Sequence, residues 1–383
     1  MTLIAAAGLS ARALVDAAVR EGFEVIALDL FGDVDTRAAA RQWLPIGEPA
    51  AMRIDDAALI DALRSLAQRG DVAGWIVGSG FEGRPDLLER GSALLPLIGN
   101  APDAVRSVRD PATFFAALDA AGIGHPEVRF DQPIDPSLDQ SLDPDGWLLK
   151  DAGGCGGWQV RRADAAAAAT LAPGHYLQRQ LPGEPMSATF VANGRHACVL
   201  GFNRLLTRGF GAHPFVFCGA IGPVSVPREV DAALRAAADA LSAAFGLRGL
   251  GSIDFMRDGS SVGVLEVNPR PPASIALYRD AGVVRAHLQA CLHGELPPLL
   301  ATHSGPVEGF EIVFARRALR IGPEAAARLA VWPRCHDRPA AGVSFGVGDP
   351  VCTLAASGDA PEPVRHHLQV DGERLLSTLE SLS

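Results

Sequence analysis

Apolar runs that alternate with helical stretches open the chain and predict a parallel α/β sheet. Leu3–Ala7 is an apolar run, and a helical stretch follows at Ala11–Glu21. A second apolar run, Phe23–Leu28, ends at Asp29. Because a strand, a helix and a second strand in this order form a βαβ unit with parallel strands, we expect a Rossmann-like domain over residues 1–100. Four further elements are expected there: helices at Asp56–Arg69 and Pro85–Arg90, and strands at Gly74–Val77 and Leu95–Ile98.

The pattern changes at Gly99-Asn100-Ala101-Pro102, where turn residues interrupt the apolar runs. We expect a mixed α and β domain over residues 101–300. Its predicted helices are Pro111–Ala121, Ala163–Ala172, Glu229–Phe245 and Arg279–Leu292. Its predicted strands are Trp147–Lys150, Trp158–Arg161, Tyr176–Gln180, Ser187–Ala192, Ser252–Met256 and Val262–Val267, and Phe130–Gly146 is a predicted surface loop. Residues 301–383 carry repeated turn signals and are expected to form a small β-rich domain.

Composition excludes several classes of partner. The net charge is −10, whereas nucleic acids and membrane surfaces call for basic patches. No apolar stretch approaches the roughly 20 residues that span a bilayer, and the first residues lack the basic start of a signal peptide. The 6 cysteines show no paired spacing, which is typical of reduced cytosolic thiols. We therefore expect a cytoplasmic protein that binds neither nucleic acid nor membrane.

A glycine-rich segment follows the only lysine of the chain. Lys150 ends the predicted strand Trp147–Lys150, and four glycines come directly after it: Gly153, Gly154, Gly156 and Gly157. Glycines let the backbone approach a ligand closely, so that successive N–H groups can point at phosphate oxygens while the lysine adds a positive charge. An ordinary glycine-rich hairpin turn is the alternative. The segment lacks the GK[ST] of a Walker loop, and strands flank it where a dinucleotide fingerprint needs a helix.

A second set of polar residues lies on a predicted hairpin. Glu266 and Asn268 are two apart on one strand and share a face, and Asp254 lies on the partner strand. Asp254 joins that face only if the hairpin has a three-residue loop or a bulge, because a two-residue turn at Asp258-Gly259 pairs the wrong positions. Two carboxylates and an amide oxygen suit Mg²⁺, and Arg270 follows directly. A hairpin whose polar side chains merely face water is the alternative.

These residues, in this order, resemble the ATP-grasp superfamily. The likeness rests on Lys150 before its glycine loop, on the strand with Gln178, on Asp254, and on Glu266-Val-Asn268-Pro-Arg270. It covers nearly the whole chain and implies an ATP-grasp fold with a preceding Rossmann-like domain and a small C-terminal β-rich domain. Gly8-Leu-Ser10-Ala-Arg12 and the stretch from Asp29 to Thr36 look like predicted carboligases related to biotin carboxylase, some of which accompany one-carbon coenzyme biosynthesis.

The resemblance implies a role for each position. Lys150 and the glycines would cover the phosphates of ATP, and Arg270 would face the transferred phosphoryl group. Mg²⁺ (or Mn²⁺) would be held by Asp254, Glu266 and Asn268. Adenine would be read by the hinge residues Gln178, Arg179, Gln180 and Leu181, and Glu184 would contact the ribose. Relatives often have a second phosphate-binding lysine where Pro111 follows Asp110, so Arg109 or Arg106 is a candidate replacement.

The expected activity is an ATP- and Mg²⁺-dependent carboxylate–amine ligase that forms a C–N bond through an acyl phosphate. Its partners would be a small carboxylate and an amine, with a homodimer as one assembly to test. Two alternatives stay open: a carboxylase that acts through carboxyphosphate, and a nucleotide-binding protein without catalysis.

Overall fold

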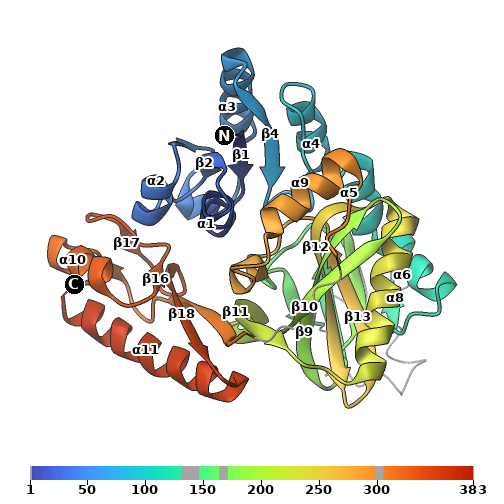
Figure 1. Cartoon of the computed structure of the whole chain (residues 1–383). Coiled ribbons are helices and arrows are strands. Elements are labelled where there is room, and N and C mark those ends of the chain that lie inside the picture. The colour runs from blue at the N-terminus through green and yellow to red at the C-terminus, as the bar shows by residue number, and fades with distance from the viewer. Residues whose placement is uncertain (1, 131–145, 164–170, 299–304, 383) are drawn as a thin grey trace.

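In its described residues the protein has four β-sheets, one of them only a pair of short strands, and the helices that pack against them (Figure 1). The computed structural model describes residues 2–130, 146–163, 171–298 and 305–382. In these ranges no helix is long and apolar enough to cross a membrane.

The N-terminal sheet is parallel and has the order β3-β2-β1-β4, which confirms the expected βαβ pattern. Its strands are β1 (Leu3–Ala7), β2 (Glu24–Asp29), β3 (Gln42–Pro45) and β4 (Val72–Val77). Its helices are α1 (Arg12–Arg20), α2 (Val34–Ala39), α3 (Asp56–Arg69) and α4 (Pro85–Ser92), with the short 3₁₀ turn η1 (Pro49–Ala51). The expected strand Leu95–Ile98 is reduced to one bridge between Leu97 and Trp75.

Helices α5 (Pro102–Arg109) and α6 (Pro111–Ala120) lead out of this sheet. Only α6 was predicted. The turn residues at 99–102, which suggested a break, lead directly into α5. Pro102 occupies the first turn of this helix, where its missing N–H is tolerated. This misassignment matters, because α5 ends at Arg109 beside the site.

A small antiparallel sheet carries the lysine. Its order is β5-β8-β6-β7, with β5 (Val128–Arg129), β6 (Trp147–Asp151), β7 (Val160–Arg162) and β8 (His175–Arg179). Strands near the predicted positions are present. The predicted loop Phe130–Gly146 and helix Ala163–Ala172 lie mostly outside the described residues.

The large sheet has eight strands in the order β13-β12-β9-β10-β11-β14-β18-β16. They are β9 (Glu184–Asn193), β10 (Ala197–Phe210), β11 (His213–Val224), β12 (Arg248–Asp258), β13 (Ser261–Asn268), β14 (Val307–Phe314), β16 (Cys335–His336) and β18 (Pro350–Gly358). The helices are α8 (Arg228–Phe245), α9 (Val283–His293), α10 (Pro323–Val331) and α11 (Pro361–Ser381), with the 3₁₀ turn η3 (Ala273–Leu277) and the pair β15 (Leu319–Arg320) and β17 (Ser344–Phe345).

The C-terminal segment departs from the β-rich expectation in two ways. Strands β14, β18 and β16 continue the large sheet, so this segment shares a sheet with the strands before it. It also ends in the long helix α11, which lies at the lower left of Figure 1. Buried Val364, Leu368, Leu375 and Leu379 follow a helical spacing, so the signal was present in the sequence and the turn residues obscured it.

Candidate functional site

A β-bulge brings the predicted metal carboxylates together. Near the turn the hairpin pairs Asp258 with Ser261, but the register shifts between Asp254 and Phe255. Beyond the shift Asp254 lies opposite Glu266, and Ser252 lies opposite Asn268. Leu265 is the extra residue, and it is only half-buried although the sequence suggested a core position. The bulge alternative of the sequence analysis is therefore the one that occurs.

Hydrogen bonds hold these oxygen donors in place. The Asn268 amide Nδ2 donates to Asp254 Oδ2 at 3.1 Å and to Ser252 Oγ at 3.3 Å, and Ser252 donates to Asp254 Oδ1 at 3.3 Å. No group of three His, Cys, Asp or Glu side chains forms a metal cluster in the described ranges. The set here is two facing carboxylates and an amide, a hard-oxygen set that fits Mg²⁺ bound together with substrate phosphates.

The two carboxylates have different charge environments. Burial, and then the neighbouring Glu266, raise the pKa of Asp254 to about 7. Burial works to raise the pKa of Glu266 as well, but Lys150 and Arg109 outweigh it and lower that pKa. Glu266 is thus the carboxylate that the surrounding cations keep ionised.

Lys150 lies buried on β6 and reaches toward this hairpin. Its Nζ donates to Gln178 Oε1 on β8 at 3.3 Å and lies 5.7 Å from the centre of the Tyr176 ring. Burial works to lower the pKa of Lys150, but Tyr176 and Glu266 outweigh it and raise that pKa. The ammonium therefore stays charged between the small sheet and the carboxylates.

The glycine loop is held by contacts from other parts of the fold. A Cβ on Gly83, in the loop after β4, would lie 2.8 Å from Gly153 Cα. A Cβ on Gly157, where φ is +78°, would lie 2.0 Å from the Phe215 carbonyl oxygen. Trp158 at the end of the loop stacks on Phe210 with ring centres 5.6 Å apart. The loop thus lies against both the N-terminal domain and the hairpin β10–β11, and its glycines permit this close approach.

Arg109 joins the loop to the metal carboxylates. From the C-terminal end of α5, its Nη1 donates to Glu266 Oε2 at 3.0 Å. Its Nη2 donates to the carbonyls of Ala152 at 2.7 Å and Gly154 at 2.8 Å. Arg106 instead pairs with Asp86 and Asp103 at the surface. Of the two arginines that the sequence offered, the structure brings only Arg109 into the site.

Arg270 meets a partner that the sequence reasoning missed. Its Nε donates to Glu82 Oε1 at 2.8 Å, and its Nη2 donates to Asn268 Oδ1 at 3.3 Å. Glu82 is 3% exposed and also accepts from the Gly80 N–H at 2.7 Å. The sequence does contain a signal that could have identified Glu82: it lies just after the predicted strand Gly74–Val77. Ligands of parallel sheets bind at the carboxyl ends of strands.

The hinge residues lie on β8 and just beyond it. Gln178 is buried against Lys150, and Arg162 donates to Gln180 Oε1 at 3.4 Å. The backbone N–H groups of Arg179 and Gln180 donate to the carbonyls of Glu127 and Gly146, each at 2.8 Å. Reading adenine through these two N–H groups would require those bonds to break, so the hinge role, and that of Leu181, stay predictions.

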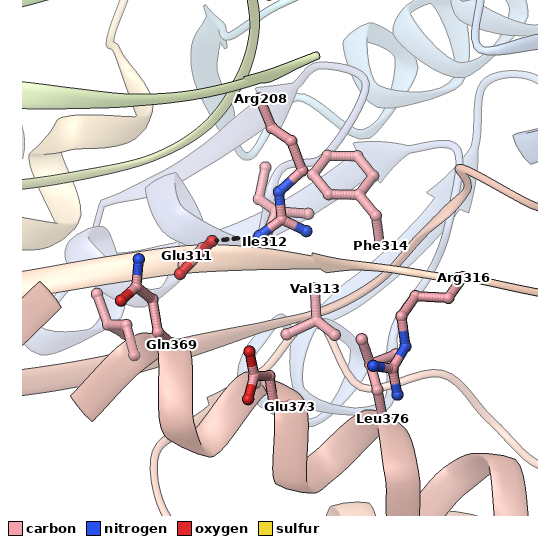
Figure 2. Close-up of a pocket in the computed structure, with 11 residues that line it drawn as sticks. Arg208, Glu311, Ile312, Val313, Phe314, Arg316, Gln369, Glu373 and Leu376 are labelled. Carbon is pink, nitrogen blue, oxygen red and sulfur yellow. Dashed lines mark hydrogen bonds and ion pairs between the residues drawn. The ribbon is translucent and has the colours of Figure 1, made fainter. Parts of the chain in front are cut away.

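Glu184 is already engaged by two arginines. Its carboxylate pairs with Arg204 at 2.9 Å and with Arg257 at 2.7 Å, and it lines a cavity of about 290 Å³ beside β10. A neighbouring cavity of about 430 Å³ lies between β14 and α11 (Figure 2). There Arg208 donates to Glu311 at 3.0 Å across the opening. Neither cavity is lined by Lys150, Arg270 or the metal carboxylates.

Comparison with known proteins identifies the fold. Residues 108–274 match the model of the ATP-grasp domain family. Biotin carboxylase from Campylobacter jejuni, in a β,γ-ATP complex, superposes with a TM-score of 0.72 at 13% identity, covering 99% of this chain and 95% of that one. N5-carboxyaminoimidazole ribonucleotide synthetase in an ADP complex gives 0.69 at 16% identity, covering 99% and 97%. L-amino acid ligase from Bacillus licheniformis gives 0.65 at 16%, covering 97% of each chain. No curated protein sequence matches the chain.

Residues 108–274 therefore match the ATP-grasp domain family, and the fold of the whole chain is similar to that of the solved structures named above. The resemblance that the sequence suggested is confirmed at this level.

Proposed function

We propose that this protein is an ATP- and Mg²⁺-dependent ligase that activates a carboxylate as an acyl phosphate and joins it to an amine. One observation carries the proposal: Lys150, Arg109 and Arg270 come from three separate elements and together lower the pKa of Glu266. Arg109 bonds to Glu266 directly, and Arg270 bonds to Asn268 on the same strand. Three cations against two carboxylates suit a polyphosphate with its metal ion. The fold is shared with an L-amino acid ligase and with biotin carboxylase, which is compatible with this chemistry.

The reaction would proceed in two steps. An oxygen of the substrate carboxylate attacks the γ-phosphorus of ATP, the bond to the bridging oxygen breaks, and ADP leaves. The amine nitrogen then attacks the acyl carbon, phosphate leaves with the electron pair of the C–O bond, and the amine proton passes to solvent. Phosphoryl transfer of this kind needs positioning and neutralisation of charge rather than a protein nucleophile.

The residues of the chain divide these tasks. Lys150 would neutralise phosphate oxygens from the small sheet, while Arg270 would face the transferred group from the end of β13. Asp254, Glu266 and Asn268 would hold Mg²⁺, which when bound offsets negative charge on the phosphates. The loop at Gly153–Gly157 would cover the phosphates and exclude water from them.

Arg109 would supply the positive charge that a second phosphate-binding lysine often supplies in relatives. It approaches from α5, directly before the Asp110-Pro111 pair where relatives often carry a lysine. Since its donors now bind Glu266 and the loop carbonyls, it would hold the glycine loop in place as well as add positive charge. A second lysine is therefore not needed for this chemistry.

Formation of ADP tests the proposal. Wild-type protein, Lys150→Met and the control Arg161→Met, which removes an exposed charge from the adjacent strand β7, are assayed with pools of carboxylates and amines. We expect ADP only when both substrates are present, and loss of activity only in Lys150→Met. Turnover stimulated by bicarbonate would favour the carboxylase instead. Near-normal turnover in Lys150→Met would refute the site, and no turnover with any pool would favour the non-catalytic alternative.

A further inference from the structure

Four aspartates gather where the N-terminal domain meets the C-terminal segment. Asp29 ends β2, Asp33 and Asp35 follow within the next turn, and Asp337 comes from the loop after β16. The loop from Asp29 to Asp35 was singled out in the sequence only for its likeness to predicted carboligases. None of the roles proposed above uses it.

Three of the four carboxylates have complete sets of partners. Asp29 accepts from the N–H groups of Ala11 and Gly32 and from the Trp43 indole. Asp35 accepts from the backbone N–H groups of Asp337 and Arg338, each at 2.9 Å. Asp337 accepts two hydrogen bonds from Arg12, at 3.0 and 3.1 Å. These bonds explain the structural role of three aspartates.

Asp33 is the exception. It is 9% exposed, yet within the described parts of the chain its carboxyl has no hydrogen bond or ion pair. It precedes α2 at the cap position, where an aspartate usually accepts from the first turn, but its side chain makes no such bond. Its oxygens are not among the fully buried polar atoms that lack a partner, so they keep some contact with solvent. A largely buried carboxyl that makes no bond and can still be reached points to a group that binds it.

The electrostatics of the cluster define what that group can be. Burial, followed by Asp337, Asp29 and Asp35, raises the pKa of Asp33 to about 8, with Arg12 acting weakly in the opposite direction. Arg12 is itself shared between Asp337 and Asp16. The other three carboxylates thus favour the neutral form of Asp33 near pH 7, and a cation bound beside it would favour the ionised form. A phosphate or carboxylate group in that place would be repelled by the same three neighbours.

The cluster lies on the same sheet edge as the reaction centre. Asp33 follows the carboxyl end of β2, and Glu82 follows the carboxyl end of β4, two strands away in the order β2-β1-β4. At about 4.8 Å between neighbouring strands the two loops begin roughly 10 Å apart. Ser10, at the end of β1 between them, is exposed, and the Asp337 side chain is 21% exposed, so the edge opens to solvent. Ligands of parallel sheets bind along this edge.

We propose that Asp33 binds a protonated amino group of the amine substrate, at the end opposite to the nitrogen that attacks the acyl phosphate. The inference rests on the proposed ligase function and narrows its acceptor to diamines or similar cations. The acceptor lies along the carboxyl edge of the N-terminal sheet, with its reacting nitrogen near Arg270. Asp35 and Asp337 add negative charge beside the bound ammonium, while their own hydrogen bonds stay intact.

Calorimetric titration of the full-length protein in the presence of Mg-ADP tests the proposal. The probes are putrescine against butylamine, and hexamethylenediamine against hexylamine, so that each pair differs by one ammonium group. We expect the wild type to bind a diamine about tenfold more tightly than its monoamine. Asp33→Asn should remove this preference, and the control Asp16→Asn, whose carboxylate is paired with Arg12, should keep it.

Two outcomes overturn the proposal: equal binding of each diamine and monoamine by the wild type, or a preference that survives in Asp33→Asn. The first needs no variant, so it holds even if Asp33→Asn folds poorly. Affinity for Mg-ADP, measured in the same preparations, separates this result from the ligase proposal. Asp33→Asn should leave that affinity unchanged, whereas Lys150→Met should lose it.

Discussion

The two sheets that face the site differ in the buried hydrophobic core that stabilises each of them. The large sheet packs Phe190, Phe255 and the residues of α8 into an extensive buried core. Among the described residues, the small sheet, which carries Lys150, encloses a cluster of four buried side chains: Trp147, Leu149, Ala163 and Leu177. The described core of the large sheet is therefore much the larger of the two, and hydrophobic stabilisation scales with the apolar area removed from water.

This difference divides two tasks between the sheets. The large sheet supplies the stable frame for Asp254 and Glu266, the proposed metal ligands. The glycine loop depends on single contacts with other elements, from Gly83, Arg109 and the aromatic rings around Trp158. Changes in the large sheet should therefore act mainly on stability, and changes around the loop mainly on activity.

The largest expected effect is on the core of the large sheet. Phe255→Ala removes a fully buried ring and should lower the free energy of unfolding by about 3–5 kcal/mol. Leu149→Ala, in the small sheet, should lower it by about 2 kcal/mol or less, because fewer buried side chains of the described residues surround it. Urea denaturation followed by circular dichroism measures both. An equal loss in the two variants would contradict the division between the sheets.

A buried histidine should make the frame sensitive to acid. Within the buried core, His287 Nδ1 accepts from the Leu250 N–H at 2.9 Å, and Nε2 donates to the Ile98 carbonyl at 3.0 Å. Burial lowers the pKa of His287 to about 4. Because the unfolded chain takes up a proton near pH 6.5 and the folded chain does not, this histidine favours unfolding as the pH falls from about 6.5 to about 4, by up to about 3 kcal/mol.

The difference between the wild type and His287→Gln isolates this contribution. In urea titrations at several pH values, the wild type should lose more stability between neutral pH and pH ~4 than His287→Gln does. Parallel curves for the two proteins would show that folding leaves the pKa of His287 unchanged, and would contradict this prediction.

Arg109 tests the prediction that changes around the glycine loop act mainly on activity. Arg109→Met breaks the bonds to Glu266 and the loop carbonyls and should slow ADP formation by about 10- to 100-fold, with little change in the urea midpoint. Arg106→Met, three residues earlier on the same helix, removes a charge at the surface and serves as the control. The assignment is wrong if both variants are equally active.

The smallest effect is expected at the contact between Gly83 and the glycine loop. Gly83→Ala places a methyl group 2.8 Å from Gly153 Cα and should raise the KM for ATP. The expected rise is about three- to tenfold, because the loop can shift. Gly99→Ala, which meets no atom within 4 Å, is the matched control. Steady-state kinetics with varied ATP compares the two, and identical KM values would argue against a closed loop in the working enzyme.

Much of the site could be read from the chain because its chemistry lies in short, local patterns. Lys150 with its glycines, and the Glu266-Val-Asn268 alternation, are each confined to one strand and its neighbouring loop. Contacts between distant segments gave no such signal. Glu82 meets Arg270 across 188 positions, and Arg109 meets Glu266 across 157.

The sequence by itself determined the parallel N-terminal sheet, the strand of Lys150 and the residue types of the proposed metal site, because local periodicity and glycine spacing dictate them. The domain boundaries at 100 and 300, the cytoplasmic location and the oligomeric state stay predictions. Only the tertiary structure decided that Asp254 faces Glu266, because one bulged residue sets that register. It also decided that Arg109 enters the site and that Asp33 is largely buried with no partner among the described residues, because both depend on how separate sheets pack together.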